Sequence, residues 1–189
     1  MPNMSSEDVI VVEGFKRRFA VKKPRKAKST KPKKKKVTKA DFLRSWGIYP
    51  GTWVRYSGLK GVYWFWFSRT VRERDYEKFG GICMTCNKYV EKGQDQAGHL
   101  FAASKCGFGL LFHPKNVHLQ HASCNNPRIT PSAGVFNSLN IAKRYGEGTI
   151  EALAKIQGTK FKEWSKAEYE ERIKKLPAYK KHLNEKEED

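Results

Sequence analysis

This sequence lacks long apolar runs and an N-terminal apolar signal segment, and it has few acidic residues for its number of basic ones. No run approaches the roughly 18 apolar residues of a membrane-spanning helix, which argues against a membrane protein. No apolar segment precedes a small-residue cleavage site, so we expect no secretory signal and a cytoplasmic location. In a reducing compartment the four cysteines are expected to be metal ligands or free thiols rather than disulfides.

The sequence does contain a large excess of positive charge. Its 189 residues include 38 Lys or Arg and 19 Asp or Glu, a formal net charge of +19. Residues 1–40 carry +11 with few apolar side chains, so we expect a disordered arm that binds phosphates; a solubilising tail or a nuclear-import signal are the alternatives. Residues 41–146 carry +8 within foldable sequence, which favours a nucleic acid as the partner over a membrane surface.

Two short cysteine and histidine motifs carry the clearest chemistry. Cys83 and Cys86 are separated by two residues, and His121 and Cys124 repeat that gap further along the chain. Two such turns facing each other would form a closed Cys₃His site for structural Zn²⁺. A redox Cys-x-x-Cys pair needs a strand leading directly into a helix, which the flanking residues do not favour. An alternative tetrad uses Cys106 in place of His121; we favour His121 and expect Cys106 to be a free thiol.

The pattern of apolar and capping residues predicts an α+β fold with mostly helical surroundings. The aromatic run 63–67 is expected to lie in the core. Expected elements are helices over 40–49, 63–79, 133–145, 149–157 and 166–185 (the last split or kinked at Pro177), a loop over 98–115, and a strand over 116–119. Expected domains are the arm 1–40, a helical lead-in 41–80, a zinc-knuckle core 81–146 and C-terminal helices 147–189.

Three short motifs lie in and between the two cysteine turns. They are Ala97-Gly98-His99, Asn116-Val117-His118-Leu119-Gln120 and Cys124-Asn125. Their order resembles the HNH nuclease motif, and it is most similar to the phage NinG (Rap) recombination endonucleases. The resemblance runs from near Leu59 to Leu183 and leaves residues 1–58 uncovered.

This resemblance implies a ββα-metal core in which a two-stranded hairpin and a helix hold one divalent cation. His99 would be the general base that activates water for attack on a phosphodiester. Asn125 would ligate catalytic Mg²⁺ or Mn²⁺, while Asn116 would brace the loop and orient His99. Zinc would only hold the scaffold.

The sequence departs from the HNH pattern just before the expected base. Many HNH enzymes have an Asp or His there as a second metal ligand, but this chain has Gly98. His118 is the first candidate to replace it and Asp95 the second. A second departure is His121, which stands where a cysteine is usual and which zinc accepts.

The function implied by the resemblance is a metal-dependent DNA endonuclease acting on branched intermediates of phage recombination, in the host cytoplasm. Holliday junctions or D-loops would be its substrates, and a homodimer would suit paired cuts on a symmetric junction. A non-catalytic zinc-ribbon protein that binds nucleic acid explains the charge and the cysteines equally well, but not His99, Asn116 and Asn125. A sequence-specific HNH homing or restriction nuclease is the other alternative.

Overall fold

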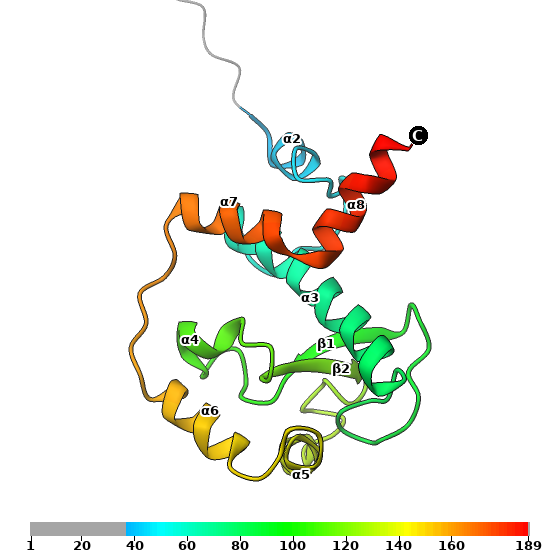
Figure 1. Ribbon diagram of the computed structural model, residues 1–189, viewed down its shortest axis with the longest axis vertical. Helices are drawn as coiled ribbons and strands as arrows, with labels where there is room; N and C mark the ends of the chain where they lie inside the picture. The colour runs from blue at the N-terminus through cyan, green and yellow to red at the C-terminus, as the bar shows by residue number, and fades with distance from the viewer. Residues whose placement is uncertain (1–36, 189) are drawn as a thin grey trace, which may run out of the picture. The chain divides into compact units, whose positions relative to one another are not determined.

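The computed structural model describes residues 37–188, so the expected basic arm lies almost entirely outside the described residues. From Val37 onward the chain forms one compact unit. Figure 1 shows short helices around one long helix and a small sheet. The helices are α2 (Lys39–Arg44), α3 (Gly58–Phe79), α4 (Gly107–Leu111), α5 (Ala133–Tyr145), α6 (Thr149–Gln157), α7 (Lys166–Lys175) and α8 (Pro177–Glu187), and the strands are β1 (Asp95–His99) and β2 (Val117–His121). Among these, no helix combines the length and apolar character needed to cross a bilayer.

The long helix α3 is the centre of the fold. It contacts α7 and α8 on one side and both strands on another (Figure 1). Trp66 is fully buried, and its indole N–H donates to the carbonyl of Trp46 at 3.1 Å. The aromatic run therefore lies mainly in the core, as expected. α3 begins at Gly58, before the predicted start at residue 63. Position 61 requires a glycine, because a Cβ atom there would overlap the carbonyl oxygen of Tyr56.

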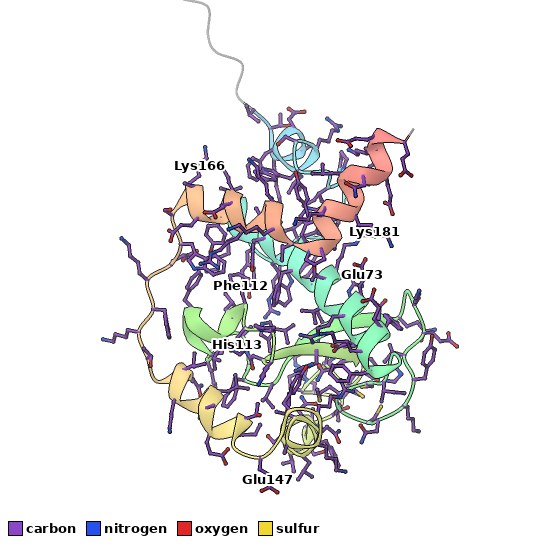
Figure 2. All side chains as sticks on the ribbon, in the orientation of Figure 1. Glu73, Phe112, His113, Glu147, Lys166 and Lys181 are labelled. Carbon is purple, nitrogen blue, oxygen red and sulfur yellow. The ribbon has the colours of Figure 1, made fainter. Side chains whose placement is uncertain are left out.

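A cluster of rings joins α3 to α4 and the C-terminal helices. The ring of Tyr63 lies 4.8 Å from that of Phe112 and 5.0 Å from that of Trp164, centroid to centroid. Phe112 follows α4 and its side chain fills the space between α4 and α3 (Figure 2). Edge-to-face aromatic pairs of this kind contribute about 1 kcal/mol each beyond the area they bury.

The two strands form an antiparallel pair, with Asp95 opposite His121 and His99 opposite Val117. The loop predicted for residues 98–115 is wrong in two places, since the range includes the end of β1 at its start and the whole of α4 in its interior. β1 has the sequence Asp-Gln-Ala-Gly-His, which has little intrinsic strand preference and depends on pairing with β2. α4 contains two glycines among five residues, and the burial of Leu110 and Leu111 stabilises it.

The C-terminal helices follow the sequence prediction closely. α5 and α6 have the predicted bounds, and Ser165 caps α7 through a capping box with Glu168. Pro177 separates α7 from α8. The first predicted helix is shorter than expected: α2 ends at Arg44 rather than at residue 49, and Gly47 follows with a φ of +70°.

Candidate metal centre and adjoining pocket

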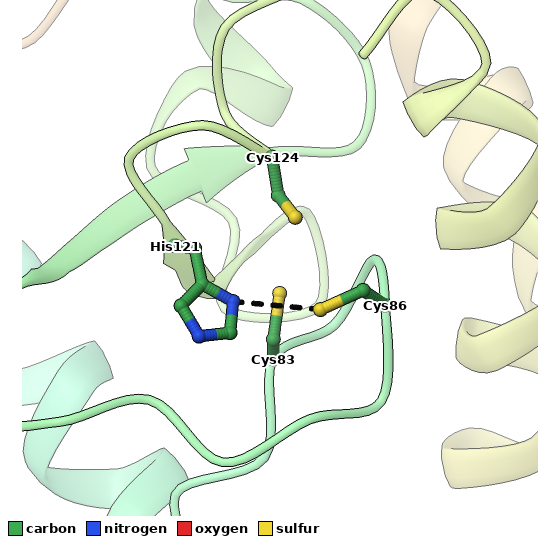
Figure 3. A group of neighbouring side chains, drawn as sticks. All are labelled: Cys83, Cys86, His121 and Cys124. Carbon is green, nitrogen blue, oxygen red and sulfur yellow. Dashed lines mark hydrogen bonds between the residues drawn. The ribbon is translucent and has the colours of Figure 1, made fainter. Parts of the chain in front are cut away.

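Three thiols and one imidazole converge near the C-terminal end of α3. Cys83 and Cys86 lie on the turn that follows this helix, His121 ends β2, and Cys124 lies on the next turn (Figure 3). One ligand atom from each residue lies within 4.8 Å of all the others. The two turns are tied together, because the backbone N–H of Met84 donates to the carbonyl of Leu119 at 2.9 Å. The predicted Cys₃His set is therefore confirmed as a group that could hold zinc.

The imidazole of His121 is oriented for metal binding. Its Nε2 lies 3.0 Å from the carbonyl oxygen of Tyr89, so Nε2 carries the proton and donates it. Nδ1 then keeps its lone pair and points toward the thiols, 3.4 Å from Cys86 Sγ. A second partner that fixes the histidine tautomer in this way is typical of zinc sites.

The pKa values of Cys83 and Cys124 are shifted in opposite directions. Burial raises the pKa of Cys83, but hydrogen bonds from backbone N–H groups, including those of Cys86 and His121, outweigh it and lower the pKa to about 7. Burial and the neighbouring Cys83 thiolate raise the pKa of Cys124 to about 12. Zinc binds cysteine as the thiolate, so a bound Zn²⁺ would offset the repulsion from Cys83 that raises the pKa of Cys124.

Cys106 lies apart from this centre. It is fully buried just before α4, within the main aromatic core, and its thiol donates to the carbonyls of Ala103 and Gly107 at 3.7 and 3.5 Å. Burial raises the pKa of this thiol above its ordinary value. The structure therefore places His121, and not Cys106, in the group that could hold zinc.

A buried carboxylate supports the metal centre from α3. Asp75 is completely buried and accepts a hydrogen bond from the backbone N–H of Leu119 at 2.8 Å. It is ion-paired with Arg74 and lies 3.9 Å from Arg144. Burial raises the pKa of Asp75, but the hydrogen bond to His118 and the adjacent positive charges hold it below its ordinary value. The sequence analysis missed this residue, because a single Asp in a charged helix looks like a solvated one.

His118 belongs to the same buried network. Its Nδ1 lies 3.3 Å from Asp75 Oδ2, and its Nε2 lies 3.1 Å from the carbonyl oxygen of Lys115. Burial lowers the pKa of its imidazole. Its side chain is 1% exposed and is not brought to the pocket that contains His99 and Asn125. The other candidate second ligand, Asp95, is ion-paired with Arg72 at 3.1 Å and also lies outside that pocket.

His99 ends β1 and faces a pocket of about 380 Å³. Its ring stacks on Trp64 with centroids 5.0 Å apart and planes 13° apart. Nε2 lies 3.0 Å from the carbonyl oxygen of Leu111, which can only accept, so Nε2 carries the proton and Nδ1 the lone pair. Burial lowers the pKa of His99 to about 4, so its ring is neutral near pH 7. This imidazole is a hydrogen-bond acceptor held in one orientation.

Asn116 joins the two ends of the segment that includes α4. Its Oδ1 accepts from the backbone N–H of Phe101 at 2.8 Å, and its Nδ2 donates to the carbonyl of Leu110 at 3.0 Å. Leu110 precedes the residue whose carbonyl holds His99. The fully buried amide of Asn116 thus positions the loop that orients the imidazole.

Asn125 lies between two adjoining pockets. It lines the His99 pocket, together with Gln120 and Arg55. It also lines a second pocket of about 390 Å³, together with Arg55, Arg72, Gln96 and the exposed Trp53. Arg55 and Trp53 carry no sequence signal, and Gln120 belongs to the Asn116–Gln120 motif but was not predicted to be a site residue. Only the folded chain brings the three beside His99 and Asn125.

Comparison with known proteins places the chain in a family. The family described as bacteriophage lambda NinG protein matches residues 10–188. The chain belongs to the NinG family. The match extends well upstream of Leu59, where the sequence resemblance was expected to begin, and therefore includes much of the basic segment. No curated protein and no solved structure gives a significant match.

Proposed function

We propose that this NinG-family chain is a metal-dependent DNA endonuclease of the HNH type, with a structural zinc centre. The observation that carries the proposal is the neutral imidazole of His99, which presents Nδ1 as an acceptor in the pocket that Asn125 also lines. A neutral, fixed imidazole next to an amide oxygen suits the activation of water beside a phosphodiester.

In this mechanism His99 acts as the general base. Nδ1 takes a proton from a water molecule, and the resulting hydroxide attacks the phosphorus. The bond from phosphorus to the leaving sugar oxygen breaks, and that oxygen takes a proton from solvent. The Leu111 carbonyl stabilises the imidazolium that forms, because it already accepts the Nε2 proton. Trp64 keeps the ring plane in place. A bound Mg²⁺ or Mn²⁺ would supply charge neutralisation at the scissile phosphate, and Asn125 is one residue that would hold it.

The zinc centre has a structural role in this proposal. The predicted set of four protein ligands is complete, and a closed tetrahedral site leaves no open position for water. It also adjoins the pocket, since Cys124 lines the pocket and His121 follows Gln120, another lining residue. Zinc would therefore fix the backbone that presents the catalytic pocket.

The second pocket suits a path for nucleic acid. Arg55 lines both pockets, and Arg72 lines the second pocket. Trp53 is 78% exposed at this pocket, where its ring could stack on an unpaired base, and the segment 41–146 carries a net charge of +8. We propose branched DNA as the substrate, because contacts to the backbone and to an unpaired base recognise shape rather than sequence.

Cleavage assays test the proposal directly. Labelled four-way-junction, flap and linear duplex DNA are incubated with Mg²⁺ or Mn²⁺ and, separately, with EDTA. We expect metal-dependent cutting that His99→Ala lowers by about 100-fold or more, while DNA binding and zinc content persist. His113→Ala is the matched control, since His113 follows α4 outside the His99 pocket. Tight binding without cutting on every substrate would refute the nuclease and favour a non-catalytic accessory protein.

A further inference from the structure

The space above Gly98 is filled by side chains from another part of the chain. A Cβ atom at this position would overlap the Oε1 of Gln120 and would lie 2.6 Å from the Oδ1 of Asn125. Gly98 precedes His99, at the position where the HNH pattern has an acidic or histidine side chain. Two amide oxygens thus converge where a side chain of residue 98 would begin.

The orientation of the Gln120 amide is determined by its neighbours. Its Nε2 donates to the Thr85 hydroxyl at 2.9 Å and to Asn137 Oδ1 at 3.2 Å. The Thr85 hydroxyl uses its own proton on Asn137 Oδ1 at 2.7 Å, so it is free to accept from Gln120. In this hydrogen-bond network Oε1 points away from Thr85 and Asn137, toward Gly98.

That oxygen is buried without a hydrogen bond. Gln120 is 2% exposed, and its Oε1 has no partner among residues 37–188. Leaving a buried acceptor unpaired costs on the order of 1–3 kcal/mol, so such atoms call for an explanation. The atom is not enclosed in an apolar core, because Gln120 lines the His99 pocket.

The Asn125 amide is oriented in a similar way. Its Nδ2 donates to Gln96 Oε1 at 2.9 Å, which leaves Oδ1 directed at the same space as Gln120 Oε1. Amide oxygens are hard ligands that suit Mg²⁺, Mn²⁺ and Ca²⁺. Within the described residues, the only cluster of three or more Cys, His, Asp or Glu is the zinc centre, so an acidic cation site is not an alternative there.

We infer that Gln120 Oε1, with Asn125 Oδ1, is a protein ligand of the catalytic divalent cation, and that Gln120 replaces the ligand that Gly98 cannot provide. This inference rests on the proposed function for the identity of the cation. Both oxygens are neutral and Arg55 lines the same pocket, so the protein supplies no negative charge to the ion. The DNA phosphate must supply it, and we expect weak binding of the cation to the free protein and tight binding with DNA.

Direct metal binding tests the inference without relying on cleavage. The zinc-loaded full-length His99→Ala protein is mixed with a four-way junction, which it should not cut, and Mn²⁺ binding is followed by the loss of the free-ion EPR signal. We expect Gln120→Ala in this background to weaken Mn²⁺ binding about 10–100-fold. Zinc content, and junction affinity measured without Mn²⁺, should be unchanged. Gln157→Ala is the matched control, because Gln157 donates to the Lys105 carbonyl and lines neither pocket.

A rescue variant covers the case in which Gln120→Ala disturbs the fold. In the double variant Gly98→Asp with Gln120→Ala, a carboxylate from β1 would enter the volume that Gln120 Oε1 now fills. We expect it to restore Mn²⁺ affinity to at least the Gln120-containing level. Unchanged Mn²⁺ affinity in Gln120→Ala, or a double variant that binds no better than a destabilised Gln120→Ala, would overturn the inference.

The two proposals fail in different ways. Gln120-dependent Mn²⁺ binding in a protein that cuts no DNA would refute the nuclease and leave the cation site intact. His99-dependent cutting with Mn²⁺ affinity independent of Gln120 would refute the cation ligand and leave the nuclease intact.

Discussion

The carboxylate of Asp75 accepts the backbone N–H of Leu119 at 2.8 Å, which fastens the middle of β2 to α3. The same carboxylate balances two arginines, and it is completely buried. Leu119 lies between His118 and Gln120, so this hydrogen bond helps to set the position of the strand that carries the site. Both stability and pocket geometry should depend on it.

Asp75→Asn should lower the free energy of unfolding by about 3–5 kcal/mol, because it leaves buried arginine charge uncompensated. The carboxyl pKa is held below its ordinary value, so its contribution is present above about pH 4 and is lost as the pH falls further. Urea unfolding at several pH values checks this. The exposed Asp41→Asn is the control and should lower the free energy of unfolding much less, because solvent screens its ion pair with Arg44. Equal losses at both positions would contradict the proposed role of Asp75.

Cys83→Ser should abolish zinc binding and unfold the region around both turns. Structural zinc contributes on the order of 10 kcal/mol in small domains, which is comparable to the total stability of a domain. Cys106→Ser is the matched control and should retain a full zinc equivalent. Metal analysis and thermal denaturation of both variants check the assignment. A folded, zinc-loaded Cys83→Ser protein would rule out Cys83 as a ligand.

Asn116→Ala should cost about 2–4 kcal/mol of stability, because it leaves the Phe101 N–H and the Leu110 carbonyl without partners in a buried region. The loop that holds His99 would then loosen. We expect the cleavage rate to fall while zinc stays bound, and the NMR signals of the His99 ring to broaden or shift. A variant with normal stability and an unchanged His99 spectrum would show that the amide does not brace this loop.

His99 should make the protein less stable in mild acid. Its pKa of about 4 in the folded chain is below the value of about 6.5 expected when unfolded. The contribution of the neutral ring is therefore fully present above about pH 6.5 and is lost as the pH falls toward 4. His99→Phe keeps an aromatic ring on Trp64 but cannot titrate. Unfolding curves of the wild type and His99→Phe should diverge over this window, and parallel curves would show that the folded pKa is not depressed.

Trp53→Ala should weaken binding to branched DNA more than binding to linear duplex. Stacking on an unpaired base is worth about 1–3 kcal/mol, so we expect a loss of about tenfold on the junction. Tyr49→Ala is the control, since Tyr49 is similarly exposed, at 76% against 78%, but does not line the second pocket. Binding titrations at one fixed salt concentration provide the comparison. An equal loss of affinity for junction and duplex would show that Trp53 does not stack on an unpaired base.

Features that depend on residues close together in the sequence could be predicted from it. The Cys83 and His121 turns have local two-residue gaps, and the bounds of α5 and α6 follow from local periodicity. β1 could not be predicted in this way, because its residues are poor strand formers and it is stabilised by pairing with β2. The sequence did show that residue 98 is a glycine and therefore cannot provide the side-chain metal ligand of the HNH pattern.

What fills the space at Gly98 depends on long-range packing. Gln120 is 22 positions away, and its amide is oriented by Thr85 and Asn137 from two further segments. No spacing rule in the sequence connects these four residues. The candidate ligand set could therefore be completed only with the fold at hand.

The adjacency of Gln120 and His121 on β2 has a consequence for how the protein matures. Successive side chains of a strand point to opposite sides, so sliding β2 by one residue would withdraw both from their partners at once. Zinc bound at His121 would favour the alignment in which Gln120 reaches Gly98. We therefore expect a newly synthesised chain to complete its pocket only after it has acquired the metal.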